Sequence, residues 1–268
     1  LRAYRLPLVS FTMNIAGPVK DTPLVRLAFR AGLAALDRDL GAPVHRESVA
    51  APTGPEALLV YPRPAGAVKD LCLRLEEQAP VGRLYDLDVL SPGGEKLSRP
   101  QSRRCLICGG PVTVCSRSRA HGLAAIQAKT EDILRSFAAG HLAQLARQAL
   151  EDEVCLTPKP GLVDRRNTGA HDDMDLPLFR RSAAALEPYF CRFVSLGMAG
   201  ASPAELQALG REAEHAMLTA TGGVNTHKGA LYSFALLLSA LGRSLTEGGD
   251  PFHTAAAIAD ALPPASGT

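Results

Sequence analysis

The residues with the most chemistry lie between Thr157 and Asp175, a stretch that opens with two prolines and a glycine. These residues cannot continue a helix, so the polar side chains after them lie on irregular backbone. Cationic groups there could hold phosphate oxygens, and clustered carboxylates could hold a hard divalent metal. The candidates are Lys159, Asp164, Arg165, Arg166, Asn167, His171, Asp172, Asp173 and Asp175. A solvated charged loop is the alternative interpretation.

A second stretch, Thr221 to Gly229, is a glycine-rich turn that leads into a strongly apolar segment. The apolar segment predicts a buried helix over residues 227–241. The turn supplies Asn225, Thr226, His227 and Lys228. Because the free amides of a helix N-terminus attract anions and a lysine adds positive charge, this stretch favours a phosphate site over a plain solvated loop.

A strand is predicted over residues 84–90, and its period of two places Asp86 and Asp88 on one face. Carboxylates about 7 Å apart repel each other unless a cation or water lies between them. The pair is therefore a candidate ligand set for Mg²⁺, and alternating acids on an exposed edge strand are the alternative. Residues 95–97 predict a short partner strand that could bring Glu95 or Arg99 to the same face.

A second possible metal site has the spacing Cys-x2-Cys-x6-Cys-x5-His, formed by Cys105, Cys108, Cys115 and His121. These are the ligand types of a structural zinc site, and the glycines after Cys108 let the chain turn back. Reduced thiols without a metal are the alternative. Nearby arginines make a local basic patch that either meets an acidic carrier protein or is plain solvated surface: Arg103, Arg104, Arg117 and Arg119.

The overall composition places limits on the partners of this chain. Its 268 residues are 46% hydrophobic and carry a net charge of only +2, which gives no argument for nucleic acid or an anionic membrane. The absence of tryptophan and an aromatic content of 5% argue against a base-stacking surface. No stretch reaches the roughly 18 consecutive apolar residues of a membrane span. Six unevenly spaced cysteines predict a reduced, cytoplasmic protein rather than a disulfide framework.

The order of predicted elements indicates two domains. Residues 1–138 alternate strands and helices in an α/β or α+β order, and residues 139–268 are helical except for the two polar stretches. The boundary is expected at Ala138 to Gly140, the soft point between helices predicted over residues 120–137 and 141–155. A later helix, over residues 178–196, is expected to bend or break at Pro188.

Both polar stretches of the second half carry a family resemblance. Pro-Lys-Pro-Gly-Leu-Val-Asp-Arg (158–165), Gly-Ala-His-Asp-Asp-Met-Asp (169–175) and Gly-Gly-Val-Asn-Thr-His-Lys-Gly-Ala (222–230) resemble the triphosphoribosyl-dephospho-CoA synthase family. The first half resembles the apo-citrate lyase phosphoribosyl-dephospho-CoA transferase family, also called holo-citrate lyase synthase. The segments that carry this match are 7–12, 17–21, 82–90 and 103–108, with Cys115 and His121.

For the second half, the resemblance implies that ATP and 3'-dephospho-CoA are joined. The 2'-hydroxyl of the acceptor displaces adenine from C1' of the ATP ribose, and the product is 2'-(5''-triphosphoribosyl)-3'-dephospho-CoA. Asp164 or His171 is then expected to be the base, and Asp172, Asp173 and Asp175 to hold Mg²⁺. Expected substrate contacts come from Lys159, Arg165, Asn167, Asn225, Thr226, His227 and Lys228.

For the first half, the resemblance implies a nucleotidyltransferase-like sheet and transfer of that product. A serine of the citrate lyase acyl carrier subunit would attack the α-phosphate, and diphosphate would leave. Asp86 and Asp88 with Mg²⁺ are expected to serve this step. Lys20, Arg83 and Arg99 are expected to bind phosphates.

The chain departs from the synthase family because it ends soon after the Asn225 to Lys228 block, so the second half is expected to be truncated. One alternative is an enzyme with transferase activity only and an inactive helical half. A second alternative is a zinc-dependent interaction module without catalysis. A working second site beside the first would instead raise the effective concentration of the shared intermediate.

Overall fold

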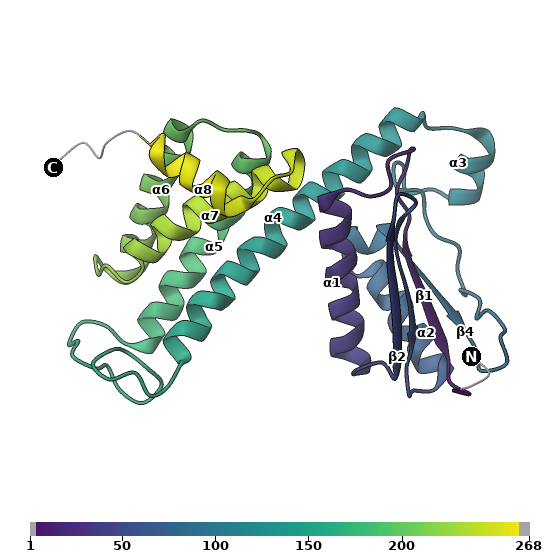
Figure 1. Cartoon of the computed structure of the whole chain (residues 1–268), viewed down its shortest axis with the longest axis horizontal. Helices are drawn as coiled ribbons and strands as arrows, with labels where there is room; N and C mark the ends of the chain where they lie inside the picture. The colour runs from purple at the N-terminus through teal and green to yellow at the C-terminus, as the bar shows by residue number, and fades with distance from the viewer. Residues whose placement is uncertain (1–3, 263–268) are drawn as a thin grey trace. The chain divides into compact units, whose positions relative to one another are not determined.

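The structure is a computed structural model that describes residues 4–262 (Figure 1). It divides into two units, Leu1–Phe137 and Ala138–Thr268. In the described part of the chain, no helix is long and apolar enough to cross a membrane.

The first unit contains a four-stranded sheet with strand order β2-β3-β1-β4. All neighbouring strands pair in antiparallel fashion, so the unit belongs to the α+β class rather than the α/β class. Its elements are β1 (Leu8–Met13), α1 (Pro23–Leu40), β2 (His45–Ala51), β3 (Gly54–Val60), α2 (Ala65–Glu77), the short 3₁₀ helix η1 (Pro80–Leu84) and β4 (Tyr85–Leu90).

The two faces of the sheet differ in polarity because side chains alternate along each strand. Val9 and Phe11 of β1 lie opposite Val89 and Leu87 of β4, and these side chains are buried. The ring of Phe11 stacks on Phe29 of α1 with ring centroids 4.5 Å apart. The buried face is therefore the apolar core of the unit, and the other face is free to carry polar groups.

The start of α1 follows the usual rules for a helix N-terminus. Thr22 accepts a hydrogen bond from the amide of Val25 at 3.2 Å, and Pro23 occupies the first turn. Gly41, with φ of +84°, ends the helix in a conformation that favours glycine.

Three features after β4 differ from the sequence prediction. The short helix α3 (Val112–Ser118) was not predicted, and the expected partner strand is reduced to one bridge between Leu90 and Lys96. The two helices expected over residues 120–137 and 141–155 are one helix, α4 (Leu123–Cys155). One glycine costs a helix only about 1 kcal/mol relative to alanine, and the alanines beside Gly140 favour the helix.

The second unit contains the end of α4 and four more described helices: α5 (Leu176–Met198), α6 (Pro203–Thr221), α7 (Lys228–Glu247) and α8 (Pro251–Asp260). A capping box starts α6, as the residue types at positions 202 and 205 predict. The Ser202 hydroxyl accepts from the amide of Glu205 at 3.4 Å, and the Glu205 carboxylate accepts from the amide of Ser202 at 2.8 Å.

The sequence predicted a bend or a break at Pro188, and helix α5 continues through this residue without a break. A proline inside a helix removes one backbone hydrogen bond, but fully buried Leu186, Phe190 and Phe193 hold the helix on both sides of it. Helix α7 packs against α5, α6 and α8 and is the centre of this unit, as predicted. At Gly197 of α5 an added Cβ would overlap the carbonyl oxygen of Ser239 in α7, so glycine permits this close packing.

Candidate functional site

The two aspartates of β4 lie on the polar face of the sheet. Asp86 pairs in register with Thr12 and Asp88 with Ser10, and both carboxylates line a cavity of about 280 Å³. Their side chains are 53% and 35% exposed, respectively, so substrate or metal could reach both from solvent. The strand places the pair on one face, as the period of two predicts.

Cationic side chains face both carboxylates. Lys96 Nζ lies 2.6 Å from an oxygen of Asp88, and this hydrogen bond raises the pKa of Lys96 above its ordinary value. An Nη of Arg103 lies 3.5 Å from an oxygen of Asp86. The positive charges reduce the repulsion within the aspartate pair.

Glu76 of α2 connects this cavity to the edge of the sheet. It is only 4% exposed and forms ion pairs with Arg99 and Arg103, and it also accepts a hydrogen bond from the amide of Leu87 at 2.8 Å. Arg103 also donates a hydrogen bond to the carbonyl oxygen of Tyr85, at 2.7 Å. Arg99 therefore lies at the cavity, as the sequence predicted, and Glu76 fixes its position.

Lys69 of α2 also lines the cavity, and it is only 8% exposed. Among residues 4–262 no carboxylate forms an ion pair with it. A largely buried lysine that lines a cavity and has no ionic partner among these residues is a candidate contact for an anionic ligand. No local sequence pattern marks Lys69, Glu76, Lys96 and Arg103 as cavity residues, because they lie 8 to 17 residues from the nearer aspartate of the pair and only the fold brings them together.

Gly82 explains how β4 reaches α2. An added Cβ at this position would overlap the carbonyl oxygen of Leu75 in α2. Only glycine permits this approach of η1 to α2, and η1 leads directly into Tyr85, the first residue of β4. The glycine of the 82–90 motif thus positions the aspartates.

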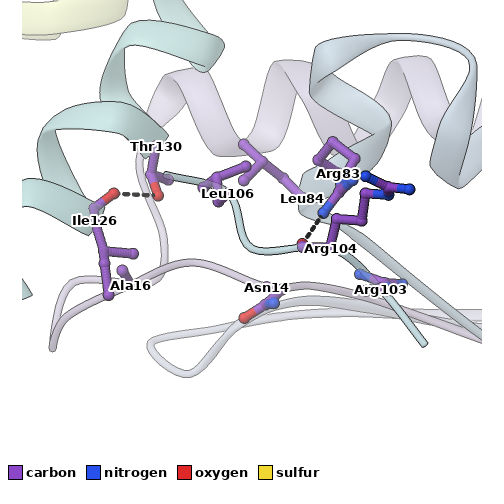
Figure 2. A pocket seen from close by; sticks show the side chains of 9 residues that line it. All are labelled: Asn14, Ala16, Arg83, Leu84, Arg103, Arg104, Leu106, Ile126 and Thr130. Carbon is purple, nitrogen blue, oxygen red and sulfur yellow. Dashed lines mark hydrogen bonds between the residues drawn. The ribbon is translucent and has the colours of Figure 1, made fainter. Parts of the chain in front are cut away.

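Arg83 lines a different cavity, of about 110 Å³. Its guanidinium donates to the carbonyl oxygen of Arg104, and Figure 2 shows both arginines on one side of the cavity, with Ile126 and Thr130 on the other. Arg103 lines both cavities. Lys20 lines neither cavity, and its ammonium donates to the carbonyl oxygen of Ile15.

The four residues of the Cys3His motif meet in space. Their candidate ligand atoms all lie within 4.8 Å of one another. Cys105 is buried, and the amides of Cys108 and Ile107 lower the pKa of its thiol to about 6. The Nε2 atom of His121 is buried and has no hydrogen-bond partner in the described part of the chain.

In the second unit, the stretch from Thr157 to Asp175 folds back on itself around Asp164. This side chain is 4% exposed, and its oxygens accept from the amides of Lys159, Arg166 and Asn167. The amides of Arg166 and Lys159 hold the pKa of the Asp164 carboxyl below its usual value. Asp164 therefore organises the loop in its ionised form.

The remaining acids of this stretch lie apart from one another. Asp175 caps α5 by accepting from the amide of Leu178 at 2.8 Å, and Asp172 and Asp173 are exposed. His171 Nδ1 lies 4.0 Å from a carboxylate oxygen of Asp173. In residues 4–262 no group of three carboxylates is placed to share a metal ion. Arg165 and Asn167 are exposed, and Asn167 accepts from the amide of Gly169.

The second polar stretch packs against the start of α5. Thr226 donates to the hydroxyl of Ser182 at 2.7 Å, and this hydroxyl lies 2.8 Å from Nδ1 of His227. A serine hydroxyl that accepts from Thr226 has its proton free to donate to Nδ1, which leaves the imidazole proton on Nε2. Nε2 is buried and has no partner in the described part of the chain.

His227 is neutral at physiological pH. Its side chain is 6% exposed, and burial lowers its pKa to about 4, although the carboxylate of Glu153 acts in the opposite direction. Asn225 accepts from the amide of Lys228 at 3.2 Å, and the ammonium of Lys228 forms an ion pair with Glu214 at 2.8 Å. Lys159 pairs with Glu153 at 2.8 Å. Ser182 lies 44 residues from Thr226, so no local sequence pattern marks it as part of this site.

Comparison with known families follows the division of the chain. Residues 1–137 match the model of the apo-citrate lyase phosphoribosyl-dephospho-CoA transferase family, over just more than half of the chain. The chain belongs to this family. Residues 139–263 match a second transferase family, ATP:dephospho-CoA triphosphoribosyl transferase. The predicted fusion of the two families in this order is confirmed.

Individual relatives are similar either to most of the chain or to its second half. The chain is 38% identical to Protein CitXG of Haemophilus influenzae, over 91% of the chain and 56% of that protein. It is 32% identical to Protein CitXG of Leuconostoc mesenteroides, over 90% of the chain and 57% of that protein. The second half is similar to a 2-(5''-triphosphoribosyl)-3'-dephosphocoenzyme-A synthase of Haemophilus ducreyi, at 41% identity over 51% of the chain and 45% of that protein. The chain thus spans little more than half the length of the fused relatives.

Proposed function

We propose that the first unit attaches a phosphoribosyl-dephospho-CoA group to a serine of the acyl carrier subunit of citrate lyase. The donor is 2'-(5''-triphosphoribosyl)-3'-dephospho-CoA, and diphosphate leaves. The observation that carries this proposal is the pair of Asp86 and Asp88 on one face of the sheet, in a cavity with basic side chains. Family membership supports the same reaction. A nucleotidyltransferase-like sheet is part of this proposal.

The donor set of the cavity fits Mg²⁺. Asp86 and Asp88 supply the hard carboxylate oxygens that this ion prefers, and both are accessible from solvent. Bound there, Mg²⁺ would neutralise phosphate charge during the transfer. Any Zn²⁺ at the Cys3His cluster has a structural role in this proposal, because four protein ligands leave no open position for substrate.

The basic side chains of the cavity bind and orient the phosphates. Lys69 lines the cavity and has no ionic partner in the described part of the chain, so a phosphate oxygen could contact it without breaking an ion pair seen there. Arg99 and Arg103 are held by Glu76 and present a fixed positive charge. Arg83 in the smaller cavity remains a candidate for the departing diphosphate. In-line transfer depends mainly on such positioning and charge neutralisation.

We propose that the second unit makes the donor from ATP and 3'-dephospho-CoA, with release of adenine. Nε2 of His227, which has no hydrogen-bond partner among the described residues, supports this, because a buried donor can hydrogen-bond a nitrogen of adenine or an oxygen of ribose. Of the two candidate bases we favour His171, because backbone amides already engage Asp164. Arg165, Lys159 and Lys228 are the proposed triphosphate contacts, and Mg²⁺ at Asp172, Asp173 and Asp175 would require the loop to close.

The proposed substrates are metabolites of the cytoplasm, so the proposed location is cytoplasmic. The test is incubation of the chain with ATP, 3'-dephospho-CoA, Mg²⁺ and apo carrier subunit, followed by the intact mass of the carrier. The expected result is a carrier heavier by one phosphoribosyl-dephospho-CoA group. Released adenine, measured by chromatography, reports the second unit separately.

Single substitutions assign the two reactions to the two units. Asp86→Asn or Asp88→Asn should lower attachment by at least about 100-fold and leave adenine release unchanged. Asp39→Asn is the matched control, because Asp39 lines neither cavity and its ion pair, among residues 4–262, is with exposed Arg38. Full attachment by Asp86→Asn and Asp88→Asn would refute the proposed site.

A further inference from the structure

The segment from Cys105 to His121 has almost no apolar core of its own. Cys105 is its only buried residue, and α3 buries no side chain at all. Ile107, Val112 and Val114 are exposed. A short segment that buries so little apolar surface needs another source of stability, such as a metal ion or a disulfide.

Backbone hydrogen bonds place the first two thiols on a tight turn. The amide of Cys105 donates to the carbonyl oxygen of Gly110 at 2.7 Å, and the amide of Gly109 donates to the carbonyl oxygen of Cys105 at 3.0 Å. Gly109 has φ of +70°, which favours glycine. The turn therefore presents Cys105 and Cys108 from one side, as a paired-cysteine zinc site requires.

The other two residues come from α3 and the turn after it. Cys115 lies in α3, with its Sγ 3.4 Å from the Sγ of Cys108. After α3, Arg119 has φ of +50° and the amide of Ala120 donates to the carbonyl oxygen of Cys115, which turns the chain towards His121. Nε2 of His121 is buried and has no partner in the described part of the chain.

The spacing of the four ligand atoms fits a tetrahedral ion. Zinc bonds of about 2.0–2.3 Å to nitrogen and sulfur place neighbouring ligands roughly 3.3–3.8 Å apart. The observed atoms all lie within 4.8 Å of one another, so small side-chain movements close the site. Three thiolates and one imidazole favour Zn²⁺ over Mg²⁺, which prefers oxygen ligands.

We propose that Cys105, Cys108, Cys115 and His121 bind one structural Zn²⁺, and that this ion holds the preceding arginines at the transferase cavities. Arg103 and Arg104 directly precede the first ligand. Arg103 contacts Glu76 and Asp86, and the carbonyl oxygen of Arg104 accepts from Arg83. The effect on the arginines rests on the proposed transferase function, whereas the zinc site itself does not.

The first test measures zinc in the tag-free full chain by inductively coupled plasma mass spectrometry. The expected result is one zinc ion per chain, lost in Cys108→Ser and in His121→Ala. His121→Cys should retain zinc, because cysteine also serves as a zinc ligand. Cys191→Ser is the matched control, since Cys191 lies in α5 of the other unit, and it should keep its zinc.

The second measurement is hydrogen exchange with and without a zinc chelator. Peptides covering residues 105–121 should lose protection, while peptides of the sheet keep theirs. A chain without zinc but with a disulfide between two of the three cysteines, or undiminished zinc in both Cys108→Ser and His121→Ala, would overturn the site. Zinc bound as expected, with full attachment by the chelated chain, would overturn the role of the ion at the arginines.

Discussion

Replacing Glu76 by glutamine should destabilise the first unit far more than the same change at its neighbour. Glu76 is 4% exposed and forms ion pairs with Arg99 and Arg103, whose side chains are 18% and 21% exposed. Glutamine keeps an oxygen for the amide of Leu87 but removes the charge. Loss of one partner from a buried ion pair costs about 3–5 kcal/mol, and the partial exposure of the arginines favours the lower limit, about 3 kcal/mol.

Glu77→Gln is the control for this prediction. Glu77 is 64% exposed and makes one 2.9 Å ion pair with Arg99, so its loss should cost less than about 1 kcal/mol. For a unit of this size, about 3 kcal/mol corresponds to a fall in Tm of roughly 10 °C. Thermal unfolding followed by circular dichroism measures the shift, and hydrogen exchange of α2 and β4 peptides assigns it to the first unit. Equal Tm values for the two variants would refute the argument.

Two further predictions concern the second unit. The pKa of His227 is about 4 in the folded chain and 6.5 in the unfolded chain, so the unfolded chain binds more protons between these pH values. The free energy of unfolding should therefore rise by about 3 kcal/mol from pH 4 to pH 6.5. The free energy of unfolding of His227→Asn should therefore change less with pH over this range than that of the unsubstituted chain. The control is His215→Asn, a change at an exposed histidine, and it should leave this pH dependence unchanged. An unchanged pH dependence in His227→Asn would contradict the assignment. Gly197→Ala should lower stability by about 3 kcal/mol because of the overlap with Ser239, whereas Gly210→Ala, whose added Cβ meets no atom within 4 Å, should raise it by about 0.5–1 kcal/mol. Urea unfolding compares the two glycine variants, and equal effects would contradict the packing of α5 on α7.

Features set by local sequence were predicted well. The common face of Asp86 and Asp88 follows from the period of a strand, and the capping box at Ser202 follows from residue types three positions apart. Both depend on interactions within a few residues. The strand predicted over residues 84–90 was found for the same reason, since β4 spans Tyr85–Leu90.

Features set by tertiary packing were not predicted. Lys69 and Glu76 line the same cavity as the aspartates because Gly82 lets η1 approach α2. No local sequence pattern predicts this approach of η1 to α2. The continuous α4 and the unbroken α5 show the same limit, because the local signals at Gly140 and Pro188 are weaker than the helical preference and packing around them. The sequence predicted Asp164 as a candidate base, but its oxygens accept hydrogen bonds from three backbone amides of the loop. Only the folded backbone shows where these amides lie.

The outer edge of β4 would otherwise offer unpaired backbone groups to a strand from another molecule. The amide of Leu97 donates to the carbonyl oxygen of Val89, Glu76 accepts from Leu87, and Arg103 donates to Tyr85, so this edge is already occupied. By occupying these backbone groups, Glu76 and Arg103 also disfavour self-association through β4. Replacing Glu76 or Arg103 by alanine would leave backbone groups of this edge unpaired and open to a strand from another molecule, and such variants should form aggregates at concentrations where the unsubstituted chain does not.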